Sequence, residues 1–274
     1  MSRCCVSTIG SVTSQHRSAL VPPFLTSIVT DLLYQHQIEI QRNLIAWRAK
    51  PLLQRIYRGF YLRVVHQIDP AIPGSIVEIG SGIGNFKSHL KSAIATDLFP
   101  NTWLDVACDC YELPFRNGTV SHLVLFDVFH HLRAPNAFLR EARRVLTDSG
   151  RIVMCEPYIS ICSFLIYGAL HDEPVAWRSP INQALWLSRP RDYYAAQGNA
   201  TRLFFRKELA ACLKGWIIFH AEAFSCFCYL LSGGFSKKAL YPLRWLDILQ
   251  WYDKRLSYWP KCFGARCVVG LCPD

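Results

Sequence analysis

The stretch Glu78-Ile79-Gly80-Ser81-Gly82-Ile83-Gly84 decides the fold, because it follows a short apolar strand predicted at Ser75–Ile79. The three glycines have no Cβ, so the backbone can turn tightly and come close to a ligand. A helix is predicted from this turn to Leu90, and its first amides would face the same ligand. Strand, glycine-rich turn and helix in this order predict a βαβ unit of an α/β protein.

Short apolar strands continue along the chain and alternate with helical stretches. The seven predicted strands are 75–79, 93–96, 103–107, 120–126, 151–155, 216–223 and 265–271. The predicted helices between the later strands are 136–146, 207–214 and 241–256. The first of these begins after Pro135 and ends at Asp148-Ser149-Gly150. This alternation predicts a mostly parallel sheet with helices packed on it.

One domain is predicted for residues 24–274, preceded by a tail at 1–23 that we expect to be disordered. The tail has no acidic residue, a composition shared with transit peptides. The domain is divided into N-terminal helices at 24–73 (24–47 and 52–68), a cofactor-binding core at 75–156, a substrate-covering insertion at 157–205 rich in aromatic residues and turns, and the C-terminal part of the sheet at 206–274.

The composition is that of a packed globular protein, with 51% hydrophobic and 18% charged residues among 274. A formal net charge of +10 is scattered along the chain, which favours a solvated basic surface over a nucleic-acid or anionic-lipid site. No apolar run in the sequence reaches the length of a membrane span. The 12 cysteines lack the spacing of zinc knuckles, so we expect reduced thiols, a cytoplasmic location and no metal site. Among them, only Cys262, Cys267 and Cys272 are considered as a candidate metal site.

Two acidic residues follow the predicted strands after the glycine turn. Asp97 ends the next strand, 19 positions after Glu78, where a carboxylate can accept hydrogen bonds from both hydroxyls of a ribose. Asp109 follows the third strand, where it can accept from an adenine amino group while a neighbouring backbone amide donates to the ring. Asn85 stands where a dinucleotide fingerprint has its third glycine, which disfavours a nicotinamide cofactor.

Five segments occur in the order and spacing of successive motifs of one enzyme family. They are Glu78–Gly84, Thr96-Asp97-Leu98, Asp109 with Leu113-Pro114-Phe115, Phe126–Leu132, and Arg144-Val145-Leu146 with Gly150-Arg151-Ile152-Val153. Together they resemble the class I S-adenosylmethionine-dependent methyltransferases, most closely the small-molecule branch (methyltransferase type 11-like). The resemblance covers residues 75–156, and Ser149-Gly150 replaces the two glycines of many members, which affects only a turn.

This resemblance implies a Rossmann-like, mostly parallel seven-stranded sheet with helices on both faces, and S-adenosyl-L-methionine as the cofactor. The residues that it places at the cofactor are Glu78, Gly80, Ser81, Gly82 and Gly84 at the methionine part, Asp97 and Leu98 at the ribose, Asp109 and Cys110 at the adenine, and Phe126 and Asp127 beside the methyl group. Methyl transfer is an in-line displacement, in which the enzyme mainly positions the acceptor.

Candidates for the acceptor side come from several parts of the domain. His130 and His131 follow the fourth strand and could act as a general base, although a packing role is the favoured interpretation. Glu156 ends the fifth strand at the ligand-binding edge of the sheet and is a third catalytic candidate. Four further residues are candidate substrate contacts with a structural alternative, a core stripe for Tyr57 and Tyr61 and a surface turn for His171 and Asp172.

The sequence therefore predicts methyl transfer to a small-molecule acceptor or to one of lipid or glycan type. Apolar and aromatic segments in the insertion and in the C-terminal third favour an amphipathic acceptor and leave peripheral membrane contact open. The sequence contains no separate nucleic-acid-binding module, and it leaves the oligomeric state undetermined. The alternative functions are a non-catalytic protein that binds an adenosine cofactor or a partner and, further off, an NAD-dependent oxidoreductase.

Overall fold

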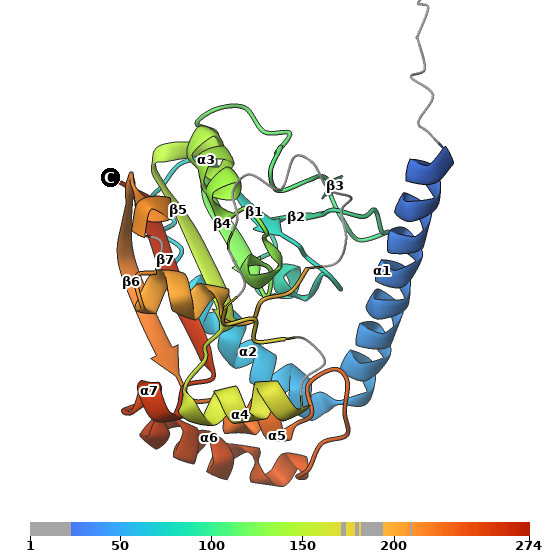
Figure 1. Cartoon of the computed structure of the whole chain (residues 1–274), viewed down its shortest axis with the longest axis vertical. Helices are drawn as coiled ribbons and strands as arrows, with labels where there is room; N and C mark the ends of the chain where they lie inside the picture. Colours follow the sequence, from blue (N-terminus) through green and yellow to red (C-terminus); the bar gives the residue numbers. More distant parts are fainter. Residues whose placement is uncertain (1–22, 171–173, 179–180, 182–193, 209) are drawn as a thin grey trace, which may run out of the picture.

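A seven-stranded sheet forms the centre of the computed structural model, which describes residues 23–170, 174–178, 181, 194–208 and 210–274 (Figure 1). Its strands are β1 (Ser75–Ile79), β2 (Ile94–Asp97), β3 (Val106–Ala107), β4 (Val120–Phe126), β5 (Leu146–Pro157), β6 (Trp216–Phe224) and β7 (Arg266–Pro273). They lie in the order β3-β2-β1-β4-β5-β7-β6. Strands β1 to β5 pair in parallel, and β7 runs antiparallel to β5 and β6. The predicted Rossmann-like, mostly parallel sheet is confirmed.

The strands bury apolar side chains on both faces of the sheet. In β4, Leu123 and Leu125 belong to one core cluster and Val124 to the other, as the two-residue period of a strand requires. In β5, Ile152 and Val153 are divided between the two clusters in the same way. Such continuous apolar runs are expected of parallel strands that are covered on both faces.

Helices cover both faces of the sheet, as predicted. The first face carries α3 (Pro135–Val145), which buries Phe138 and Leu139. The same face is covered by a π-helical turn at Thr201–Phe205 and a 3-10 turn at Ala210–Leu213. The helices on the second face are α2 (Pro51–Val65), α5 (Phe227–Leu231) and α6 (Leu246–Leu256).

The remaining helices lie outside the two faces (Figure 1). The long helix α1 (Pro23–Ala49) runs along one side of the molecule, where the rings of His36 and Phe99 have centroids 5.0 Å apart. Helices α4 (Ile161–Leu170) and α7 (Pro260–Phe263) lie with α5 and α6 at the end of the sheet where β5 and β6 finish. No helix in the described part of the chain combines the length and the apolar character needed to cross a membrane.

The helix predicted after the glycine turn is the main correction to the expected fold. The structure has only a 3-10 turn at Asn85–Ser88, because residues 85–93 must both bury Phe86 and return the chain to β2. A crossover between parallel strands is usually covered by its own helix. Here α2 supplies that cover, and Tyr61 packs on Phe86 with ring centroids 5.9 Å apart. The amides of a full helix N-terminus therefore do not face the ligand.

Three other predicted elements are shorter in the structure. The helix at 207–214 is reduced to a 3-10 turn, since Lys207 has a left-handed φ of 55°. The helix at 241–256 begins only at Leu246, after the extended Pro242 and a 3-10 turn. The strand at 103–107 keeps only its last two residues, since Trp103 turns back toward the glycines. Two further differences concern the part after α3. The insertion, which was expected to be rich in turns, contains the helix α4. The residues 148–150, which were predicted to end a helix, lie within the strand β5.

Candidate cofactor and acceptor site

The glycine turn after β1 provides a surface where a ligand can approach the backbone. Gly80, Gly82 and Gly84 have φ values of 68°, 51° and 74°. A Cβ on Gly80 would lie 2.5 Å from Cγ2 of Val128, so this position requires glycine for packing. A Cβ on Gly82 would meet no atom within 4 Å, so the space beside this residue is open. The turn is thus held against the loop after β4 on one side and leaves room on the other.

Asp97 at the end of β2 shapes this turn. Its Oδ2 accepts a hydrogen bond from the Gly82 amide (2.9 Å), and its Oδ1 accepts one from the Leu98 amide (2.7 Å). The carboxylate is buried, whereas the Leu98 side chain is 40% exposed. A carboxylate has about four acceptor positions, so each oxygen of Asp97 retains capacity for a further donor such as a hydroxyl.

Trp103, which the sequence analysis did not single out, belongs to the same site. Its Nε1 donates a hydrogen bond to the carbonyl of Gly82 (2.9 Å). Its ring covers Gly84, where an added Cβ would lie 2.6 Å from Cδ1. A tryptophan in the connection after β2 was the available signal, but its contact with the turn depends on the tertiary fold.

Two buried polar atoms at the glycine turn find no hydrogen-bond partner among the described residues beyond the contact between the Glu78 carboxyl and the Ser81 hydroxyl. They are Oε2 of Glu78 and Oγ of Ser81. Burial, with the charge of Asp97 adding to it, raises the pKa of Glu78 to about 8. Buried polar groups in native proteins are almost always paired, so these two atoms indicate that a polar ligand completes the site. The ammonium and carboxylate of the methionine end of S-adenosylmethionine fit this requirement.

The raised pKa of Glu78 predicts a pH-dependent stability of the ligand-free protein. Between its ordinary value of 4.5 and about 8, the unfolded chain releases the proton that the folded chain keeps. Stability should therefore fall as pH rises through this window, by at most about 1.4 kcal/mol per pH unit. Urea unfolding at pH 5 and pH 8 should show this loss in the wild type and not in Glu78→Gln. The exposed Glu112→Gln is the control, and an equal loss in Glu78→Gln contradicts the assignment.

The predicted adenine contacts follow β3 and lie next to Asp97. The Cys108 amide donates to the carbonyl of Asp97 (2.8 Å), which ties this segment to the end of β2. Asp109 is half-buried, and its Oδ1 accepts a hydrogen bond from the Tyr111 amide (3.0 Å). Burial raises the pKa of the Cys110 thiol, so this cysteine stays neutral. Glu78, Asp97 and Asp109 thus follow one another along the carboxyl ends of β1, β2 and β3.

Asp127, the first residue after β4, is held by a buried arginine. It adopts a left-handed φ of 55°, and its amide donates to the carbonyl of Cys155 (3.0 Å). Its Oδ1 accepts from Arg266 Nη1 (2.5 Å), and its Oδ2 lies 3.4 Å from the Tyr57 hydroxyl. Burial raises the pKa of Tyr57, so the phenol keeps its proton and can donate.

Arg266 was missed by the sequence analysis. It lies at the start of β7 with a relative exposure of 2%, and its guanidinium carbon is 5.2 Å from the ring centroid of Phe60 and 5.7 Å from that of Tyr229. A single arginine in the otherwise apolar strand Ala265–Leu271 was the available signal, because a buried arginine requires an acidic partner. The sequence does not reveal which acidic residue that is.

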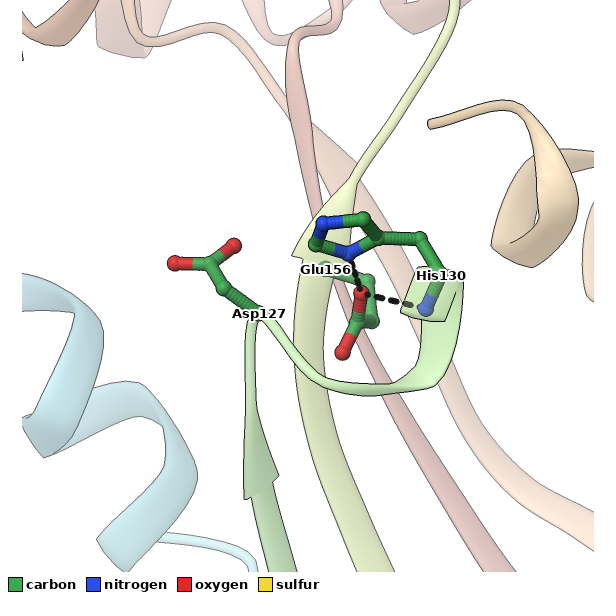
Figure 2. A group of neighbouring side chains, drawn as sticks. All are labelled: Asp127, His130 and Glu156. Atoms are coloured by element: carbon green, nitrogen blue, oxygen red, sulfur yellow. Dashed lines mark hydrogen bonds and ion pairs between the residues drawn. The ribbon is translucent and has the colours of Figure 1, made fainter. Parts of the chain in front are cut away.

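Glu156 holds the same loop from the other face of the sheet. This fully buried carboxylate accepts from the amides of Val128 (2.9 Å) and Phe129 (2.8 Å) through Oε1. Its Oε2 lies 2.7 Å from Nδ1 of the buried His130. A dashed line marks this contact in Figure 2. Neighbouring residues of a strand point to opposite faces, so Cys155 faces Arg266 while Glu156 faces His130. The loop is therefore fixed on both sides of the sheet edge.

Three side chains in the described part of the chain are close enough together to be considered as metal ligands. They are Asp127, His130 and Glu156, whose ligand atoms all lie within 4.8 Å of one another. However, both oxygens of Glu156 already accept hydrogen bonds, and Asp127 is paired with the cationic Arg266. Figure 2 shows the Asp127 carboxylate directed away from Glu156. We interpret the group as two separate pairs, Glu156 with His130 and Asp127 with Arg266. Within the described residues, Cys262, Cys267 and Cys272 do not form a candidate metal group.

The remaining candidates occupy different environments. His131 Nδ1 lies 2.8 Å from the carbonyl of Tyr194, which ties the loop after β4 to the insertion. Tyr61 and Phe126 pack edge to face, with ring centroids 4.6 Å apart. Tyr57 and Tyr61 therefore lie beside the end of β4 and also belong to the α2 core stripe. His171 and Asp172 lie outside the described residues.

Comparisons with known proteins identify a domain at this site. The family model described as a methyltransferase domain matches residues 77–154, which include the glycine turn, both acidic residues and the loop after β4. No curated protein matches the chain.

Several solved structures are similar to the chain. Geranyl diphosphate C-methyltransferase from Streptomyces coelicolor A3(2) shares 11% identity, covers 81% of this chain and 80% of its own, and has a TM-score of 0.47. Phosphoethanolamine N-methyltransferase 2 from Haemonchus contortus shares 15% identity, with coverages of 79% and 53% and a TM-score of 0.45. A Haloferax volcanii methyltransferase in complex with the Trm112 activator shares 15% identity, with coverages of 90% and 97% and a TM-score of 0.43. At these identities and TM-scores, the three solved structures give no information about the acceptor of this chain.

Proposed function

Since this chain carries a class I S-adenosylmethionine-dependent methyltransferase domain of the type 11 branch, we propose that it methylates an apolar or amphipathic acceptor. The acceptor would bind beside the loop after β4, at the carboxyl edge of the sheet, where ligands of open α/β sheets usually bind. The observation that carries this proposal is the group of aromatic rings around Asp127, whose own carboxylate is neutralised by Arg266.

The aromatic rings at this edge come from three separate elements. Tyr57 and Tyr61 on α2 have ring centroids 5.8 Å apart, and Phe126 at the end of β4 packs on Tyr61. Tyr229 on α5 packs on Tyr57, again with centroids 5.8 Å apart. Apolar walls with a few fixed polar groups are typical of small-molecule sites. An acceptor with an apolar part is therefore better suited to this edge than a strongly anionic one.

The residues of the chain mainly hold the two reactants in place. S-adenosylmethionine supplies an activated methyl group on a sulfonium sulfur when it is bound. Glu78, Ser81 and Gly82 would hold its methionine end, and Asp97 and Asp109 the ribose and adenine. The bound cofactor would give this methyl group to the acceptor atom, and the electrons of the broken carbon–sulfur bond would remain on sulfur. Correct placement of the acceptor accounts for much of the rate in such a step.

His130 is our candidate for the base that takes a proton from an O–H or N–H acceptor. Because Glu156 is placed to accept from Nδ1 of His130, the acceptor lone pair of the imidazole would lie on Nε2. Glu156 itself is saturated by the loop amides, so we assign it a positioning role instead of the catalytic one considered from the sequence. His131 would support the loop through Tyr194.

Replacement of Asp97 by alanine should weaken cofactor binding. The change removes both the proposed ribose acceptor and the partner of the Gly82 amide, and we expect a loss of about 1–3 kcal/mol in binding free energy. Isothermal titration with S-adenosylmethionine and S-adenosylhomocysteine measures this loss. Asp148→Ala, at an exposed position remote from the turn, serves as the control. An affinity of Asp97→Ala equal to that of the wild type refutes the ribose assignment.

The proposed function is tested by supplying a labelled methyl donor. Extracts of small molecules and of lipids are incubated with the protein and S-adenosylmethionine carrying a labelled methyl group, and the products are profiled by mass spectrometry. Label in an apolar or amphipathic product, absent without the protein, supports the proposal. Label only in water-soluble ionic products overturns the acceptor class. Cofactor binding without any labelled product in either extract favours a non-catalytic cofactor-binding protein.

A further inference from the structure

The outward side of α6 and of the residues that flank it is unusually rich in exposed aromatic and aliphatic side chains. Trp245, Ile248, Trp251, Tyr252 and Trp259 are all more than half exposed, with Trp259 at 60%. We call these five residues, with the basic residues of 244–261, the aromatic–basic face. Large exposed apolar patches on monomers usually mark interaction surfaces.

The helix α6 is anchored through its opposite side, so this face is not free to turn inward. Leu246 is fully buried in the second core cluster. The buried Asp253 accepts hydrogen bonds from the Ser225 hydroxyl and the Phe227 amide, both at 2.7 Å. The exposed residues 245, 248 and 252 recur at three- and four-residue intervals and form one stripe. The helix therefore carries apolar side chains on two opposite sides. One side packs on the core, and the other faces away from it.

Basic side chains surround this stripe. Residues 244–261 contain four basic and two acidic residues. Both acidic residues are engaged within the fold, since Asp253 is buried and Asp247 pairs with Arg55 at 2.8 Å. Arg255 lies over the ring of Trp251, with the guanidinium carbon 4.9 Å from the ring centroid. The exposed charge of the face is therefore strongly positive.

We propose that the aromatic–basic face docks the protein on the surface of a membrane that contains anionic lipid. Tryptophan and tyrosine favour the boundary between head groups and acyl chains, because their rings are apolar and carry one polar atom. Lysine and arginine beside them are attracted to the anionic head groups. A second copy of the chain is a poorer occupant, since a two-fold contact would bring the same positive charges together.

The aromatic–basic face lies at the same edge of the sheet as the proposed acceptor site. Helix α4 follows the end of β5, and α5 follows the end of β6. Helices α4 to α7 therefore gather at the carboxyl edge of the sheet, and α3 lies toward the other end of the molecule (Figure 1). Docking through α6 would place the proposed acceptor site near the membrane. This consequence rests on the proposed function, whereas the docking itself does not.

Vesicle co-sedimentation of the full chain tests the proposal. The wild type should bind vesicles of phosphatidylcholine with phosphatidylserine, bind pure phosphatidylcholine much more weakly, and lose binding as salt is raised. Lys254→Glu with Arg255→Glu should weaken binding more than about tenfold, since each basic residue near an anionic surface contributes about fivefold. Trp251→Ser with Tyr252→Ser should weaken it to a similar extent. All four positions are exposed, so these changes should leave the fold intact.

Two control variants test whether a loss of vesicle binding is specific to the aromatic–basic face or follows from any change in surface charge or hydrophobicity. Arg140→Glu with Arg143→Glu makes the same charge change on exposed positions of α3, and Tyr34→Ser with Ile45→Ser removes exposed apolar residues on α1. Both should bind within about twofold of the wild type, because neither pair lies on the face.

Absence of vesicle binding, or equal loss in the α3 variant, overturns the proposal. Dimers that Trp251→Ser with Tyr252→Ser abolishes, with no vesicle binding, would assign the face to self-association. Isothermal titration with S-adenosylmethionine is unaffected by the docking variants, so failure of docking and failure of methyl transfer are distinguishable.

Discussion

Arg266→Met should lower the free energy of unfolding by about 3 kcal/mol. Removing one partner of a buried ion pair costs about 3–5 kcal/mol, because the other charge is left without compensation. The lower end applies here, since the Asp127 side chain remains 29% exposed and water can reach it. Urea unfolding followed by circular dichroism measures the change.

A second substitution separates the charge from the packing in this prediction. Arg266→Met combined with Asp127→Asn should recover part of the lost stability, because no uncompensated carboxylate remains. Arg266→Lys should rescue less, since an ammonium cannot reach both the Asp127 carboxylate and the Cys155 sulfur in the way the guanidinium does. A loss below about 1 kcal/mol in Arg266→Met would show that the buried pair is not a main support of the fold.

Glu156→Ala should lower the rate of methyl transfer about 100-fold and lower cofactor affinity much less. The substitution leaves the buried amides of Val128 and Phe129 and Nδ1 of His130 without their acceptor, so the loop after β4 shifts. A displacement of about 1 Å in a positioning element can cost 100-fold in rate. The cofactor site lies mainly on β1 to β3 and does not include Glu156.

The readouts for Glu156 distinguish positioning from simple unfolding. Incorporation of labelled methyl groups into the extract that yields product gives the relative rate, and titration with S-adenosylhomocysteine gives the affinity. Glu156→Gln should retain more activity than Glu156→Ala, because an amide oxygen can still accept from the two loop amides. A full rate in Glu156→Ala would refute the positioning role. Equal loss of rate and of cofactor binding would assign Glu156 to general stability.

The core between residues 75 and 156 was largely predictable, because its signals are local. Glycines at 80, 82 and 84 do adopt left-handed φ values, which the residue type favours, and the strands Ser75–Ile79 and Val120–Phe126 begin and end where predicted. The missing helix after the turn was not predictable, since α2, which precedes β1, covers that part of the sheet. Propensity is a weak guide where another element supplies the packing.

The sequence by itself determined the type of fold and the place of an adenosine-cofactor site, because strand periodicity, glycine conformation and the spacing of acidic residues are properties of short segments. The methyl donor followed from the resemblance of these segments to one enzyme family. Only the tertiary structure decided which groups hold the loop after β4. Arg266 reaches Asp127 across 139 positions, and Glu156 reaches His130 across 26. Buried charges must find partners wherever the sheet brings them, and strand order, which short segments do not encode, brings β4, β5 and β7 together. The same is true of the aromatic–basic face, whose exposure depends on which side of α6 the core takes.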